Sequence, residues 1–94
     1  MVNAIVLLTV ERGRVGEVAE QLAGLSGVSE VYSVAGSVDL VAMVRVKSND
    51  ELADVVTNEM QRIEGIESTE TLIAFRAYSR VDLEGVFSLG FPAS

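Results

Sequence analysis

Two segments of the chain, residues 3–10 and 40–46, are apolar at nearly every position. Side chains alternate between the two faces of a β-strand, so an unbroken apolar run indicates a strand that is covered on both faces. In residues 3–10, for example, Val6 and Leu8 would lie on the first face. The alternate positions that we expect to form a second apolar face are Ile5, Leu7, Val41, Met43 and Val46. Both faces of the sheet therefore need a covering layer.

Two amphipathic helices are available to cover one of these faces. Apolar side chains recur every three or four residues over 15–25, and we expect the Ser-Gly pair at 26–27 to end this helix. Ser48 followed by Glu51 is a capping box that predicts the start of a second helix. We expect the Glu-Gly pair at 64–65 to end it.

Two further strands complete the pattern, at residues 28–35 and 66–78. The turn at residues 36–39 is short, which favours an antiparallel hairpin with the strand at 40–46. The resulting order, βαββαβ, is typical of a ferredoxin-like fold. We predict the α+β class: a four-stranded antiparallel sheet with two helices on one face, which dimerises through its open face.

The size of the chain supports this need for a partner. The chain has 94 residues, of which 49% are hydrophobic, and its mean hydropathy is +0.37. A domain this small leaves much of its surface exposed, so subunit contacts are the simplest way to bury the apolar excess. We expect one domain over residues 1–78. Residues 79–94 form an apolar extension that we expect to pack on the domain or on a neighbouring subunit.

The residues that catalysis most often uses are absent from this sequence. It contains no cysteine and no histidine, which excludes thiolate nucleophiles, histidine bases and histidine metal ligands. The acidic residues are spread over the helices without an isolated pair. We therefore predict that the protein is not an enzyme and that it has no catalytic residue, no metal site and no cofactor.

The charge of the chain limits its partners. Fourteen acidic and seven basic residues give a net charge of −7, which disfavours direct binding to nucleic acid or to an anionic membrane. We see no signal peptide and no apolar run long enough to span a membrane. We predict a cytoplasmic protein.

Two polar segments are the candidate ligand-binding positions. In the turn, Gly36 permits a close approach to the backbone, and Asp39 offers a carboxylate to an ammonium group. In the last strand, Thr69 and Thr71 are two residues apart and share one face. Each segment also has a purely structural explanation, because turns favour Gly and Asp and strands favour Thr.

Taken together, these segments resemble the ligand-binding and assembly (RAM) domain of the Lrp/AsnC regulators. The turn at 34–40 is similar to the family's Gly-x-x-Asp signature, and residues 63–73 are similar to its Gly-Val and Thr-x-Thr strand. The resemblance covers residues 1–78. The family's N-terminal helix-turn-helix domain has no counterpart in these 94 residues, which suggests a stand-alone form.

The resemblance implies a function and a site. Family members form dimers through their sheet faces and assemble further, often to octamers. Small effectors, commonly amino acids, bind between dimers. The implied ligand-binding residues are Gly36, Ser37, Val38, Asp39, Thr69 and Thr71. An amino acid or similar effector, other copies of the chain and a full-length Lrp/AsnC regulator are the expected partners.

Two alternatives remain open from the sequence. The first is a small dimeric ferredoxin-like enzyme of the oxygenase or isomerase type. The second is an ACT-like regulatory domain, which would extend its sheet side by side with that of a neighbour instead of pairing sheet faces.

Overall fold

Four strands form one antiparallel sheet with the order β2-β3-β1-β4. The computed structural model describes residues 1–78, so the predicted extension at 79–94 lies outside the described residues. The strands are β1 (Val2–Val10), β2 (Val28–Ser33), β3 (Leu40–Val46) and β4 (Ile66–Ile73). β1 and β3, the two segments with unbroken apolar sequences, are the central strands, and β2 and β4 are the edges.

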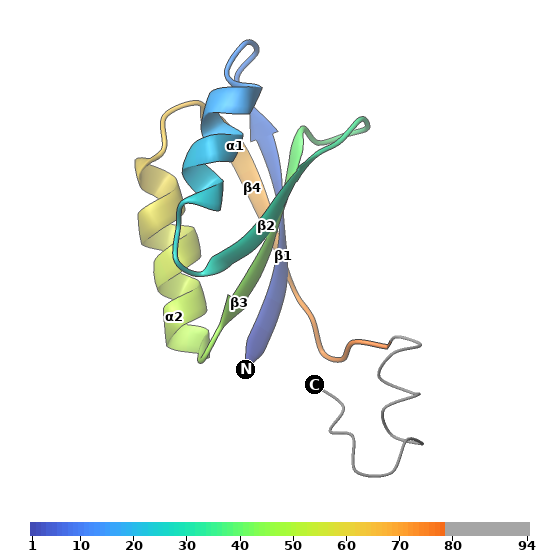
Figure 1. Cartoon of the computed structure of the whole chain (residues 1–94), viewed down its shortest axis with the longest axis vertical. Helices are drawn as coiled ribbons and strands as arrows, with labels where there is room; N and C mark the ends of the chain where they lie inside the picture. Colours follow the sequence, from blue (N-terminus) through green and yellow to red (C-terminus); the bar gives the residue numbers. More distant parts are fainter. Residues whose placement is uncertain (79–94) are drawn as a thin grey trace.

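The helices lie together on one face of the sheet (Figure 1). The first is α1 (Val15–Ala23). The second begins as α2 (Asn49–Asp54) and continues through a π-helical turn, η1 (Val55–Glu59), and a 3-10 turn, η2 (Met60–Arg62). This arrangement confirms the predicted α+β ferredoxin-like fold.

The helix ends follow the local sequence. The Ser48 hydroxyl accepts a hydrogen bond from the Glu51 N–H at 3.2 Å, as the capping box predicts. α1 ends at Ala23, before the predicted Ser26-Gly27 stop. Gly24 already occupies the cap, where its N–H donates to the carbonyls of Glu20 and Gln21, because glycine favours helix ends over helix interiors.

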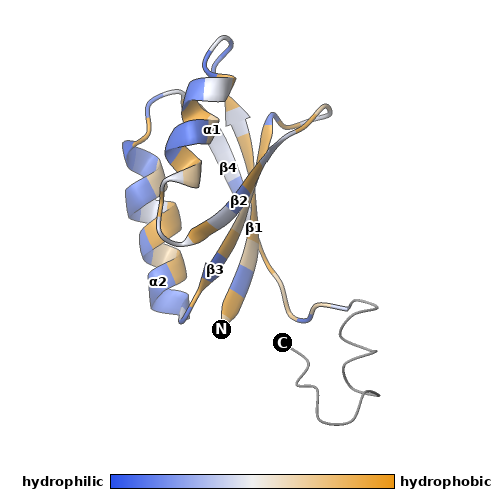
Figure 2. Cartoon of the chain, viewed as in Figure 1, coloured by the Kyte–Doolittle hydropathy of each residue, from blue (hydrophilic) through white to orange (hydrophobic). Residues whose placement is uncertain are grey.

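The hydrophobic core lies between the helices and the covered face of the sheet. Its central side chains, Val6, Leu8, Leu22, Leu40 and Met60, are fully buried. Figure 2 shows the helices hydrophilic on their outer sides and hydrophobic toward the sheet. Val46 also belongs to this core, with 6% of its surface exposed. Its predicted place on the opposite face was wrong, because Val46 is an even number of residues from Leu40 and strand side chains repeat every two residues.

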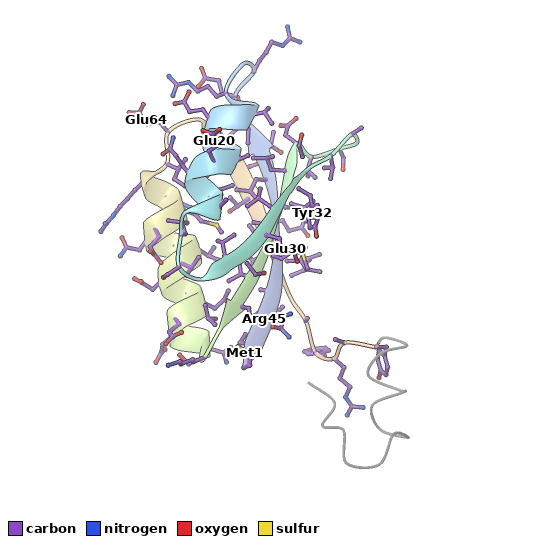
Figure 3. All side chains as sticks on the ribbon, viewed as in Figure 1. Met1, Glu20, Glu30, Tyr32, Arg45 and Glu64 are labelled. Atoms are coloured by element: carbon purple, nitrogen blue, oxygen red, sulfur yellow. The ribbon has the colours of Figure 1, made fainter. Side chains whose placement is uncertain are left out.

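The opposite, open face of the sheet has an apolar centre and polar margins. Its centre consists of half-buried side chains from the two central strands, Ile5, Leu7, Val41 and Met43. Toward one end, the Arg45 guanidinium donates to the Asn3 side-chain oxygen at 3.1 Å. Figure 3 shows Tyr32 and Arg45 on the side of the sheet away from the helices.

Each edge strand contains one extra residue relative to its partner. In β2 the register shifts between Val28 and Glu30, and in β4 the residue pairs skip Glu67. Such bulges move later side chains to the other face and are common at sheet edges. The β4 bulge allows Ile66 and Thr69 to share a face despite their odd spacing.

The edge strands are shorter than predicted. β2 ends at Ser33 instead of residue 35, and β4 ends at Ile73 instead of residue 78. The last contact of β4 is a hydrogen bond from the Ala74 N–H to the Asn3 carbonyl at 2.9 Å. β1 begins at Val2, two residues beyond Ala4, which is the register partner of Ile73, so residues 76–78 have no length of β1 beside them. None of the helices within residues 1–78 is long and apolar enough to cross a membrane.

Gly27 marks a tight contact between the α1–β2 loop and the rest of the fold. A Cβ atom at this position would lie 2.9 Å from Val55 Cγ2 and 3.0 Å from Val46 Cγ1. We expect Gly27→Ala to lower the free energy of unfolding by about 1–3 kcal/mol, because the added methyl overpacks the core. Urea denaturation measures this change.

Gly16→Ala is the matched control. Gly16 lies in α1, and a Cβ there would meet no atom within 4 Å. We expect a stability gain of about 0.5–1 kcal/mol, because alanine loses less backbone entropy in a helix. Equal effects of the two substitutions would contradict the packing explanation.

Candidate functional site

The structure brings the turn and the threonine strand to the same end of the sheet, on the two sides of β1. The Asp39 N–H donates to the Leu8 carbonyl at 2.9 Å. On the other side of β1, Thr69 is the register partner of the same Leu8. The two predicted segments, which are 30 residues apart in the chain, therefore flank one residue of the central strand.

Asp39 makes three hydrogen bonds that hold the turn to the sheet. Besides the bond from its N–H to Leu8, its side-chain Oδ2 accepts from the Val10 N–H at 2.8 Å. Its carbonyl accepts from the Val34 N–H at 3.1 Å. Asp39 therefore does stabilise the turn, as its purely structural explanation requires. Its side chain does so through a hydrogen bond to Val10, which is distant in the sequence, and not through a bond within the turn. The Val10 N–H is a backbone group, so no side-chain pattern in the sequence could have revealed it.

Gly36 adopts a backbone conformation that suits glycine. Its φ angle is +148°, which side-chain-bearing residues rarely adopt. A Cβ at this position would meet no atom within 4 Å, so the space around the turn is open. The neighbouring Ser37 is exposed and Val38 is half-buried. The turn therefore presents an accessible backbone that Asp39 holds in place.

Thr69 and Thr71 share one face, as predicted, and that face is the one that the helices cover. Thr69 pairs with Leu8 and Thr71 pairs with Val6, and both partners are core residues. Directly paired residues of an antiparallel sheet project to the same side. Both threonines are nevertheless half-buried, because β4 is an edge strand.

The six predicted residues do not enclose a pocket within one chain. β1 separates the turn from β4, so Leu40 and Thr69 lie roughly 10 Å apart across two strand spacings. One cavity among the described residues, about 550 Å³, is bordered by Gly27, Val46 and Val55. A smaller one, about 380 Å³, lies beside Leu25 and Ile63. Neither is lined by any of the six predicted residues.

Tyr32 is an ionisable residue within 1–78 whose pKa is shifted. The Glu30 carboxylate accepts a hydrogen bond from the Tyr32 hydroxyl, and this bond raises the pKa of Tyr32 above its usual value, with the negative charge of Glu30 adding to the effect. A tyrosine with a raised pKa is a poor base or nucleophile near neutral pH. Among residues 1–78, no three acidic side chains gather as a metal-binding group would require.

The hydrogen bond from Val10 to Asp39 predicts a difference between two substitutions. Asp39→Ala removes the acceptor and leaves a part-buried N–H unpaired, so we expect a stability loss of about 1–3 kcal/mol. Asp39→Asn keeps a side-chain oxygen for this bond and should lose clearly less. Chemical denaturation of both variants tests this, and equal losses would show that charge, and not the hydrogen bond, stabilises the turn.

Comparisons with known proteins match this chain to the Lrp/AsnC ligand binding domain and to HTH-type transcriptional regulators. The family model of the Lrp/AsnC ligand binding domain matches residues 3–82. An uncharacterised HTH-type transcriptional regulator of Pyrococcus horikoshii is 41% identical over 59 residues, covering 63% of this chain and 39% of the relative. The HTH-type transcriptional regulator FL11 of Pyrococcus furiosus is 33% identical over 75 residues, covering 80% and 49%. The chain thus spans half or less of the length of these curated relatives.

Solved structures with a similar fold are also found. The crystal structure of a protein from Thermus thermophilus has a TM-score of 0.80 and 52% identity, covering 85% of this chain and all of that one. The feast or famine regulatory protein from M. tuberculosis, solved in complex with L-methionine, has a TM-score of 0.69 and 25% identity, covering 85% and 54%. With its family-model match over residues 3–82 and its ferredoxin-like sheet, this chain belongs to the Lrp/AsnC ligand-binding domain family.

Proposed function

We propose that this protein is an effector-binding and self-association module that recognises an amino acid or a similar small molecule. The observation that carries this proposal is the convergence of the Gly36–Asp39 turn and the β4 threonines on the two sides of β1 at Leu8. The chain belongs to a ligand-binding domain family, which supports ligand binding as the role of these two segments. A fold alone would not, because ferredoxin-like sheets serve many functions.

The chemistry of the six residues suits a zwitterion. The open turn at Gly36 and Ser37 offers backbone N–H groups to a carboxylate. Asp39 uses Oδ2 for the Val10 N–H, and its other oxygen remains for an ammonium group. The Thr69 and Thr71 hydroxyls add donors and acceptors. The L-methionine complex of the M. tuberculosis relative supports an amino acid as the class of ligand.

We propose that the site is completed by a second subunit. The turn and the threonines lie too far apart for one small amino acid to contact both within a chain. The turn lies at the end of the β2–β3 hairpin, with Ser37 exposed, and β4 forms an edge of the sheet, so each is accessible to a neighbour. Pairing of open sheet faces would give a dimer, and dimers would assemble to a larger ring such as an octamer.

A regulatory role would then act through assembly. The curated relatives are HTH-type transcriptional regulators, and this chain spans half or less of their length. We propose that it affects transcription by co-assembling with a full-length regulator of the same family, without catalysis and without contacting DNA itself. Its net charge of −7 disfavours direct contact with the phosphates of DNA.

Titration calorimetry with a panel of amino acids tests ligand binding. We expect at least one to bind, and Asp39→Asn and Thr69→Val each to weaken binding about tenfold or more, as loss of a charged or hydroxyl contact requires. Thr57→Val is the control, because the Thr57 hydroxyl is bonded to the Ala53 carbonyl on the helix layer, away from the site. Absence of heat for every amino acid would refute the proposal.

Sedimentation analysis tests the pairing of open faces. Leu7→Glu places a charge at the apolar centre of the open face, and we expect it to convert the dimer to a monomer, because an unpaired buried charge costs several kcal/mol. Ala23→Glu adds the same charge on the exposed side of α1 and should leave the dimer intact. Equal behaviour of the two variants would place the interface elsewhere.

A further inference from the structure

Residues 74–78, here called the exit segment, leave the sheet after its last hydrogen bond. That bond joins the Ala74 N–H to the Asn3 carbonyl. β1 begins one residue before Asn3, so by the register of the pair only Val2 of β1 lies opposite the exit segment beyond Ala74. The segment follows β4 directly but is not itself part of a strand.

Large apolar side chains at and before this exit are exposed. Phe75 is 99% exposed and Tyr78 is 81% exposed. The last two residues of β4, Leu72 and Ile73, are 44% and 55% exposed. Leu72 pairs with Ile5 on the open face, whereas Ile73 pairs with Ala4 on the helix-covered face. The exposed apolar side chains that can extend the open face are therefore Leu72, Phe75 and Tyr78, and exposed apolar groups of this kind mark interaction sites in soluble proteins.

The exit segment is continuous with the open face of the sheet. Leu72 is the register partner of Ile5, so both side chains lie on that face. Figure 1 shows residues 74–78, in orange, leaving the sheet on the side away from the helices. The exit segment therefore projects toward the space that a second copy would occupy when it covers the open face.

The exit segment carries one positive charge, and the open face carries two negative charges and one positive charge. Arg76 is the single charged residue of the exit segment. The open face carries two carboxylates, Glu30 and Glu70, which pair with Met43 and Leu7 of the central strands, and one guanidinium, Arg45. In a chain with a net charge of −7, an exposed arginine beside an apolar anchor offsets repulsion between two copies.

We propose that the exit segment of one copy packs against the open sheet face of a second copy, with Phe75 as its apolar anchor. A two-fold axis makes the contact reciprocal, so each dimer contains it twice. The inference rests on the proposed self-association and adds that the exit segment, and not the sheet faces alone, forms the interface. The alternative occupant of the space around Phe75 is a segment of its own chain.

A tryptophan introduced in place of Phe75 reports on this contact, because the chain contains no tryptophan of its own. In full-length Phe75→Trp we expect blue-shifted emission and weak quenching by acrylamide at concentrations where sedimentation shows a dimer. Dilution to the monomer, or addition of Leu7→Glu, should shift the emission to the red and restore quenching. Ala53→Trp, on the exposed side of α2, is the control that should stay quenchable throughout.

The outcomes separate the two proposals. If Phe75→Trp forms a dimer in which the introduced indole is freely quenched, this inference is overturned and the sheet-face dimer stands. Emission that stays protected when the dimer dissociates assigns Phe75 to its own chain and also overturns the inference. A chain that is monomeric at every concentration refutes the self-association and the exit-segment contact together.

The strength of the contact is measured separately. We expect Phe75→Ala to raise the dimer dissociation constant at least about tenfold, equivalent to about 1.4 kcal/mol, as truncation of an aromatic anchor does. Gln61→Ala, an uncharged truncation on the exposed side of η2, should change it less than about threefold by the same scale. Equal dissociation constants for Phe75→Ala and the wild type would contradict the anchor role.

Discussion

The pairing of β1 with a strand on each side is the constraint on which the rest of this structure depends. β3 and β4 both take their register from β1, and β2 is added through β3. β1 is also the strand whose side chains at Ala4, Val6, Leu8 and Val10 are buried against the helices. Because one strand fixes both the sheet and the core, a change in its register would displace every segment of the candidate site.

The candidate site depends on the backbone of β1 more than on its side chains. Asp39 contacts β1 through the Leu8 carbonyl and the Val10 N–H. Thr69 is placed by its register with Leu8. One carboxylate oxygen of Asp39 fixes the turn, and we propose that the other binds the ligand, so the two contacts would not compete. A turn held in place before binding loses less conformational freedom when a ligand arrives.

Much of the fold could be predicted because its signals are local. The unbroken apolar runs of β1 and β3, the capping box at Ser48 and the shared face of Thr69 and Thr71 depend on neighbours within a few residues. The overestimated length of β4 also came from a local signal. Apolar residues up to position 78 suggested a longer β4, but β4 ends at Ile73, and β1 supplies only two more residues beyond the partner of Ile73, Ala4. The sequence of β4 does not reveal where β1 begins.

The sequence by itself determined the fold class, the apolar excess and the residue types available for binding, because periodicity and composition act through the chain's own neighbours. Only the tertiary structure decided which strand the turn and the threonines flank, that the Asp39 carboxylate holds the Val10 N–H, and that the six residues leave no enclosed pocket in one chain. These depend on register, on bulges at Ser29 and Glu67, and on backbone groups. Such features arise when segments distant in the sequence pair, and no single segment encodes them.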